Sequence, residues 1–118
     1  MEGDDYPMRL RTLTVWGLPQ LVSLPQWLKG SANTLQHLHI SGCENLVVLP
    51  EWLQDLNSLQ NLNIWACQKL TSLPEGMDRL TALRELEIIG CPKLSRNCER
   101  EVGEDWTKIA HIPQVHID

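Results

Sequence analysis

The stretch LQHLHISGC, at residues 35–43, recurs along the chain at nearly constant spacing. Its counterparts are LRTLTVWGL from Leu10, LQNLNIWAC from Leu59 and LRELEIIGC from Leu83, and all four read L-x-x-L-x-(V/I)-x-x-(C/L). The step is 24 residues from Leu35 to Leu59 and again from Leu59 to Leu83, and it is 25 residues from Leu10 to Leu35. Four copies in phase predict a repeat architecture, in which each copy buries its apolar face against its neighbours.

The pattern is that of the leucine-rich repeat, whose period is about 20–29 residues. Within L-x-L-x-I, alternate side chains point to opposite faces of a strand, so the apolar ones enter the core and the others face solvent. Successive strands stack side by side in parallel, about 4.8 Å apart. The repeats therefore predict one parallel sheet with one solvent-facing side.

The segments that return from one strand to the next contain a Leu-Pro pair in the first three copies, at Pro25, Pro50 and Pro74. Proline lacks an N–H and disfavours helix in the residue before it, so we expect extended or 3₁₀ segments with at most short helical turns. Trp27 and Trp52 hold matching places in LPQWL and LPEWL and are expected to stack on one another. We predict an α/β fold, a short horseshoe-shaped leucine-rich-repeat solenoid with the parallel sheet on its concave face and a C-terminal cap.

Composition narrows the class of protein. The chain of 118 residues is long enough for one domain, and its net charge of −5 argues against a nucleic acid partner, which needs a basic face. We find no run of about 18–20 apolar residues that would span a membrane, no signal-peptide pattern in MEGDDYPMRL and no Asn-x-Ser/Thr sequon. These features predict a cytoplasmic or nuclear protein whose four cysteines are thiols.

The outward positions of the four predicted strands form the candidate protein-contact surface. Trp16, Trp65 and Ile89 are large apolar residues at positions that point to solvent, as interface anchors often do. The alternative is that the tryptophans cover the edge of the sheet or meet a neighbouring domain. The candidate contact residues are Trp16, His37, His39, Asn61, Asn63, Trp65, Glu85, Glu87 and Ile89.

Other chemistry is disfavoured by spacing. His37 and His39 share a face with Glu85 and Glu87, but two strand steps separate the pairs by about 10 Å, too far for shared metal ligation or direct proton transfer. We also find no Gly-rich phosphate loop, no G-x-S-x-G and no H-E-x-x-H. We therefore expect no enzymatic activity, no metal and no cofactor.

The cysteines follow the repeat. They hold one position in three copies, at Cys43, Cys67 and Cys91, where Leu18 stands in the first copy. This spacing is not a chelating one such as C-x-x-C, and a small thiol at the turn can reach neighbouring backbone carbonyls. Cys98 lies outside the series and is expected to belong to the cap.

The Leu rhythm stops at Asn97, which predicts a cap over the last repeat. CEREVGEDW is charged and contains Gly103, so it should turn or form a short helix, with Trp106 and Ile109 offering apolar surface. PQVHID alternates apolar and polar residues and could add a final strand that starts at Pro113.

We accordingly divide the chain into a lead-in with an incomplete cap at residues 1–9, about four repeats at residues 10–96 and the C-terminal cap at residues 97–118. The first rung, formed by Leu10, Leu13 and Val15, should be exposed unless Tyr6, Pro7 and Met8 fold over it. That region is therefore the expected weak end of the solenoid.

The ladder LxxLxIxxCxxLxxLPxxL, followed by CPKLSRNCEREVGEDWTKIAHIPQVHID, resembles the C-terminal end of plant disease-resistance proteins of the coiled-coil, nucleotide-binding, leucine-rich-repeat class. The tail is the discriminating part, and Thr107 is a minor departure from the usual pattern. The resemblance implies a defence protein whose repeats bind a pathogen effector or a guarded host protein and, in a full receptor, contact the nucleotide-binding module in cis. No G-x-x-x-x-G-K-S/T occurs, so nucleotide binding does not carry over. We interpret the chain as a truncated receptor, an incomplete gene model or a standalone remnant.

Three alternatives stay open. A cytosolic leucine-rich-repeat adaptor or inhibitor outside immunity would share the repeat but has no reason to end in GEDWTKIAHIP. An extracellular receptor ectodomain would be expected to carry L-x-G-x-IP segments, which we do not find. An enzyme would need a catalytic constellation.

Overall fold

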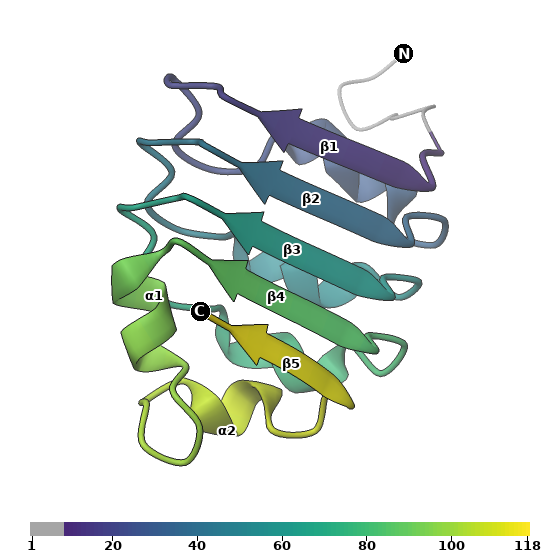
Figure 1. Ribbon diagram of the computed structural model, residues 1–118. Coiled ribbons are helices and arrows are strands. Elements are labelled where there is room, and N and C mark those ends of the chain that lie inside the picture. The colour runs from purple at the N-terminus through teal and green to yellow at the C-terminus, as the bar shows by residue number, and fades with distance from the viewer. Residues whose placement is uncertain (1–8) are drawn as a thin grey trace.

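The computed structural model describes residues 9–118 of the chain (Figure 1). Its elements, in order, are β1 (Thr12–Trp16), η1 (Gln26–Ser31), β2 (His37–Ser41), η2 (Glu51–Asp55), β3 (Asn61–Trp65), η3 (Glu75–Arg79), β4 (Glu85–Ile89), α1 (Pro92–Asn97), α2 (Trp106–Ile109) and β5 (Gln114–Ile117). The η elements are 3₁₀ helices.

The strands within residues 9–118 form one five-stranded parallel sheet in chain order, β1 to β5 (Figure 1). Equivalent repeat positions face each other throughout, as in the row Leu13, Leu38, Leu62, Leu86 and Val115. A constant repeat length imposes this register, because each strand then starts at the same height as its neighbour. The predicted fold class is confirmed, and so is the final strand that begins after Pro113.

The 3₁₀ helices lie behind the sheet as seen in Figure 1, on the convex side. Each follows a proline with extended backbone, Pro25 (φ −70°, ψ 144°), Pro50 (φ −71°, ψ 154°) or Pro74 (φ −65°, ψ 159°). The carbonyls of Pro25 and Pro50 accept hydrogen bonds from the N–H groups three residues later, each at 3.1 Å. Proline thus starts a tight 3₁₀ turn, as the sequence predicted.

The expected stacking of Trp27 on Trp52 is wrong. The Nζ atom of Lys29 lies 5.8 Å from the centroid of the Trp52 ring, so a cation–π contact takes the place of the second indole. No ring contact between these two tryptophans occurs, although the structure describes both residues. Trp27 keeps 37% of its surface exposed.

The core is built from leucine and isoleucine, and the inward residues of β2, β3 and β4 are essentially inaccessible to solvent. The cysteine series closes each turn as expected, with the Cys43 thiol 3.8 Å from the carbonyl of Ser41 and the Cys67 thiol 3.4 Å from that of Trp65. The backbone then turns through a left-handed residue, which is glycine after β1, β2 and β4 but Ala66 (φ 56°) after β3. An alanine in this conformation is strained.

Two charged residues of the cap bind one backbone unit of the third return segment. The carboxylate of Asp105 accepts a hydrogen bond from the N–H of Leu73 (2.8 Å), and the ammonium of Lys108 donates one to the carbonyl of Leu73 (2.7 Å). Lys108 and Asp105 also pair with each other at 2.9 Å. We call this arrangement the Leu73 clamp. It explains why charged residues occur in a segment that covers the core.

The rest of the cap closes the last rung. Ile109 and Cys98 are fully buried, and Ile112, which the sequence reading did not single out, is 5% exposed. A side chain on Gly103 would collide with the backbone of Asn97, so glycine permits a close approach at that point.

At the other end, the first rung is less exposed than expected. Val15 is buried, whereas Leu10 and Leu13 are half-buried and Leu18 is exposed. Tyr6, Pro7 and Met8, the expected lead-in contacts, lie outside the described residues. The division of the chain at residues 9/10 and 96/97 stays a prediction.

Candidate functional site

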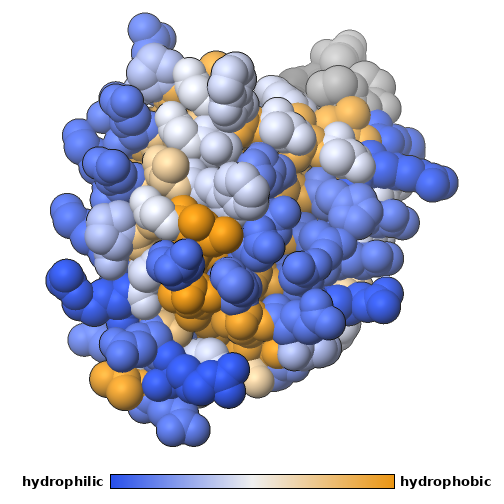
Figure 2. Space-filling model, viewed as in Figure 1, coloured by the Kyte–Doolittle hydropathy of each residue, from blue (hydrophilic) through white to orange (hydrophobic). Residues whose placement is uncertain are grey.

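The concave face is the solvent-facing side of the sheet, opposite the 3₁₀ helices. The strand register arranges its side chains in three rows. The first row is Thr12, His37, Asn61, Glu85 and Gln114; the second is Thr14, His39, Asn63, Glu87 and His116; the third is Trp16, Ser41, Trp65 and Ile89. All the candidate contact residues of β1 to β4 fall in these rows. Figure 2 shows polar side chains over much of this face and an apolar area near the carboxyl ends of β4 and β5, beside α1.

Trp65 is the centre of a cluster in the middle of the face. Its ring meets that of His39 edge to face, with centroids 4.8 Å apart and planes at 73°, and its Nε1 donates a hydrogen bond to Glu87 Oε1 at 3.1 Å. His39 and Glu87 flank Asn63 in the register. An indole that touches both of them therefore lies across Asn63.

The amide oxygen of Asn63 is buried and has no hydrogen-bond donor. An unpaired buried acceptor of this kind costs about 1–3 kcal/mol of stability. Such a cost in a folded protein calls for an explanation, which an ordered water molecule can supply as well as a ligand. It leaves the cluster of His39, Asn63, Trp65 and Glu87 with an unused acceptor at its centre.

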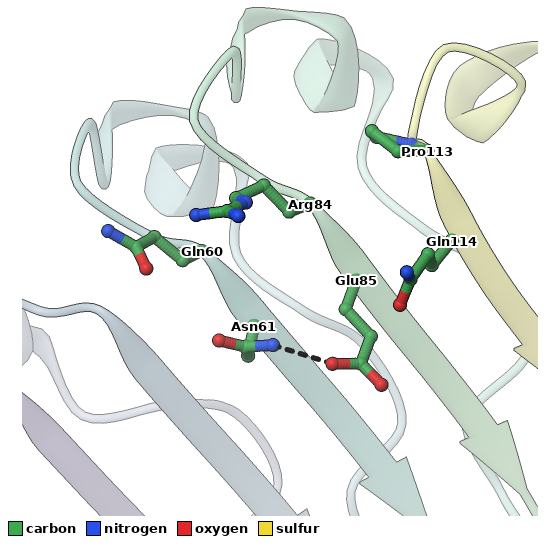
Figure 3. Close-up of a pocket in the computed structure, with 6 residues that line it drawn as sticks. All are labelled: Gln60, Asn61, Arg84, Glu85, Pro113 and Gln114. Carbon is green, nitrogen blue, oxygen red and sulfur yellow. Dashed lines mark hydrogen bonds between the residues drawn. The ribbon is translucent and has the colours of Figure 1, made fainter.

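A second contact lies beside this cluster, in the first row. Asn61 Nδ2 donates to Glu85 Oε1 at 2.8 Å, and the two side chains point toward each other from β3 and β4 (Figure 3). They line a shallow polar hollow of about 550 Å³ at the start of β3 to β5, together with Gln60, Arg84, Pro113 and Gln114.

The structure therefore brings most of the candidate residues into one surface, but not all of them. Trp16 is 75% exposed and lies two strands from Trp65, with Ser41 between them in the register. His37 is exposed and lies outside the cluster, whereas Ile89 is half-buried next to Trp65 in the register. Trp65 itself is 38% exposed.

The sequence reading missed two residues of this face, Gln114 and His116 on β5. The alternation in PQVHID contained the signal, because Gln114 and His116 occupy the polar positions of that strand. They extend the first and second rows beyond the four repeats.

Two buried thiols, Cys67 and Cys91, lie in the turns that follow β3 and β4. The hydrogen bond between Cys67 and Cys91 raises the pKa of the Cys67 thiol, with burial adding to the shift, and lowers that of Cys91 to about 7. Both residues are buried, so neither thiol is presented to a substrate. Within residues 9–118, no group of three or more His, Cys, Asp or Glu side chains is placed to hold a metal ion.

Comparison with known families shows which family the chain belongs to. Residues 5–65, just over half of the chain, match the family model for R13L1/DRL21 LRRs, which are leucine-rich repeats of plant disease-resistance proteins. The chain belongs to this family. The match to the R13L1/DRL21 repeats covers β1, β2 and β3, including Trp16, His39, Asn63 and Trp65.

No curated protein matches the chain. Repeats of the R13L1/DRL21 kind make a fold that typically serves non-catalytic protein interaction. Among the helices of residues 9–118, none is long and apolar enough to cross a membrane.

Proposed function

We propose that this chain is the protein-binding leucine-rich-repeat segment of a plant intracellular immune receptor, acting in the cytoplasm or nucleus. Its concave face binds a pathogen effector or a guarded host protein. The receptor's nucleotide-binding module lies outside these 118 residues and would contact the repeats in cis. The observation that carries the proposal is the Trp65 cluster, set on repeats of a disease-resistance family.

The cluster has the features of a protein-binding anchor. A tryptophan offers a large contact area, and here two neighbours hold its ring in place before a partner arrives. The surrounding His, Asn and Glu side chains supply hydrogen-bonding groups around that apolar centre. All of them project from a regular sheet, which fixes their spacing better than loops would.

The alternative is a leucine-rich-repeat adaptor outside immunity. The family match favours the resistance reading, because that family consists of disease-resistance repeats. Sequencing the 5′ end of the native transcript separates the two. An upstream reading frame with a phosphate-binding loop supports the receptor, and an upstream frame without one contradicts it.

Binding through the concave face is tested with a matched pair of variants. Trp65 and Trp27 are 38% and 37% exposed, but Trp65 lies on the concave face and Trp27 on the convex side. The chain is co-expressed in leaves with individual pathogen effectors, and pairwise association is measured together with effector-dependent cell death. Trp65→Ala should abolish association with a recognised effector while Trp27→Ala retains it.

Each variant is first checked by circular dichroism, because a contact residue must be removable without unfolding the chain. Equal effects of Trp65→Ala and Trp27→Ala on association would contradict binding through the concave face. Unfolding of Trp65→Ala would show that the indole belongs to the core.

A further inference from the structure

Negative charge on the concave face is confined to its C-terminal part. The outward residues of β1, β2 and β3 are Thr, Trp, His, Ser and Asn, whereas β4 presents Glu85 and Glu87 on the same face. These two carboxylates are two residues apart on one strand, so their Cα atoms are about 7 Å apart. The chain as a whole carries a net charge of −5.

Neither carboxylate is neutralised by the described part of the chain, since the ion pairs there involve Lys108 with Glu75 and Asp105. Glu85 uses Oε1 to accept from Asn61, and Glu87 uses Oε1 to accept from Trp65. These two bonds orient the side chains and leave the second oxygen of each without a partner among residues 9–118. The carboxylates are thus held in place by neutral donors.

Asn63 Oδ1 does not add to these acceptors, because it is buried and the indole of Trp65 lies across Asn63. The surface therefore offers the free carboxylate oxygens of Glu85 and Glu87 beside the indole of Trp65, which is 38% exposed. A ligand that complements it must bring several N–H donors, a positive charge and a flat group that packs on an aromatic ring.

An arginine side chain meets all three requirements. Its guanidinium carries five N–H donors in one plane, stays charged at any physiological pH and stacks on aromatic faces. Charge-assisted hydrogen bonds to carboxylates are among the stronger ones available to it. Lysine has the charge but lacks the planar group.

We propose that Glu85, Glu87 and Trp65 form a receptor site for an arginine side chain on the surface of the protein partner. This inference rests on the proposed function, because it names the chemistry of the partner that the concave face binds. A metal ion is the other ligand class that carboxylates attract. The described residues offer no group of three or more ligating side chains for one.

The test uses the whole chain, labelled with ¹⁵N, and two peptides that differ in one side chain. Acetyl-Gly-Arg-Gly-amide is compared with the same peptide containing citrulline, which keeps the length and planar shape of arginine but is neutral and has a carbonyl oxygen in place of one NH₂ group. The indole N–H signal of Trp65, assigned from the Trp65→Phe variant, reports binding. The arginine peptide should bind roughly tenfold more tightly than the citrulline peptide, and high salt should weaken that preference.

Matched variants show whether Glu85 and Glu87 cause the preference for the arginine peptide. Glu85→Gln combined with Glu87→Gln should remove the preference for arginine, because it removes both charges and keeps the side-chain shapes. Glu51→Gln combined with Asp55→Asn removes two exposed charges from η2, on the opposite side of the sheet, and should leave the preference unchanged. Equal binding of the two peptides, or a preference that survives in the concave double variant, would overturn the arginine site.

The arginine site and the proposed function can fail independently of each other. Suppose an effector binds in a manner that depends on Trp65, but neither the concave double variant nor the arginine peptide affects it; then only the arginine site fails. Suppose instead that the arginine peptide binds as expected while no effector requires Trp65. In that case the site stands and the proposed function fails.

Discussion

Replacing Asp105 with alanine should strongly destabilise the chain. Asp105 is 5% exposed, its Oδ2 accepts from the Leu73 N–H at 2.8 Å, and its Oδ1 lies 2.9 Å from the Lys108 ammonium. The substitution leaves a buried N–H without an acceptor and a mostly buried ammonium without its closest counter-charge. Breaking a buried charged pair from one side costs about 3–5 kcal/mol.

That loss is large against the total. A chain of 118 residues is expected to have a free energy of unfolding of roughly 6–18 kcal/mol, at about 0.05–0.15 kcal/mol per residue. Asp105→Ala should therefore lower the urea midpoint strongly, measured by tryptophan fluorescence and by circular dichroism. Coincident transitions with an unchanged slope would show that folding is still cooperative.

Two further variants separate the contributions of the Leu73 hydrogen bond and of the charged contacts with Lys108 to this loss of stability. Asp105→Asn keeps an acceptor for the Leu73 N–H but loses the charge and the oxygen that faces Lys108. It should cost less than Asp105→Ala, because only the contact with Lys108 is lost. Glu75→Ala removes the other partner of Lys108, at 3.3 Å, but that side chain is 85% exposed and the loss should stay below about 1 kcal/mol. If Asp105→Ala costs no more than Glu75→Ala, the Leu73 clamp does not hold the cap on the repeats.

Three other predictions follow from single residues, each checked by urea unfolding. Ala66→Gly should stabilise the chain by about 1 kcal/mol, because it removes the strain of an alanine in the left-handed conformation. Gly42→Ala, at the equivalent position (φ 68°), should destabilise the chain by a similar amount, and the opposite signs would refute the strain argument. Gly103→Ala should cost about 1–3 kcal/mol through collision with the Asn97 backbone, whereas Val102→Ala, at a site 75% exposed, should be close to neutral. Burial, with Asp105 adding, raises the pKa of the Cys98 thiol to about 12 from an ordinary 9.0. A thiol whose pKa is raised by folding contributes stability that is complete below pH 9 and is lost as the pH rises toward 12. The free energy of unfolding should therefore fall by up to about 4 kcal/mol between these pH values, and the fall should be smaller in Cys98→Ala.

The regular part of the fold could be predicted because one signal determines several features at once. The repeat length sets the strand register, the alternation sets which residues face out, and the prolines set the 3₁₀ segments. The strands β1 to β4 accordingly start and end at the residues that the repeat alignment marks, and the alternation in PQVHID also identified β5. These are local patterns, and local patterns are what a sequence displays directly.

The Leu73 clamp could not be predicted in this way. Asp105 and Lys108 lie 32 and 35 residues from Leu73, and their partner is a backbone unit whose identity as leucine has no influence on the contact. Nothing in the composition of the tail signals such a target. The stacking of Trp27 on Trp52 failed for a related reason, since Lys29 competes for the same ring.

The candidate surface was predictable in position but not in organisation. The pattern assigns Trp65 to the outer face, yet it does not show that the ring bends across Asn63 to meet His39 and Glu87. Which rotamer the indole adopts depends on the cross-strand neighbours together. The unused Asn63 oxygen follows from that choice, and only the folded arrangement reveals it.

The cap and the acidic end of the concave face are physically connected. Glu85 and Glu87 project from β4, whose outer edge pairs with β5, and β5 follows directly from the segment that contains the Leu73 clamp. Without β5, β4 would be the edge strand, and edge strands are the part of a sheet that opens most easily. The charged tail therefore has two effects: it covers the core, and it places the two carboxylates in the interior of a sheet. Asn61 and Trp65 orient the two carboxylates on the concave face, but the strand that holds them depends on β5 and on the clamp residues behind it.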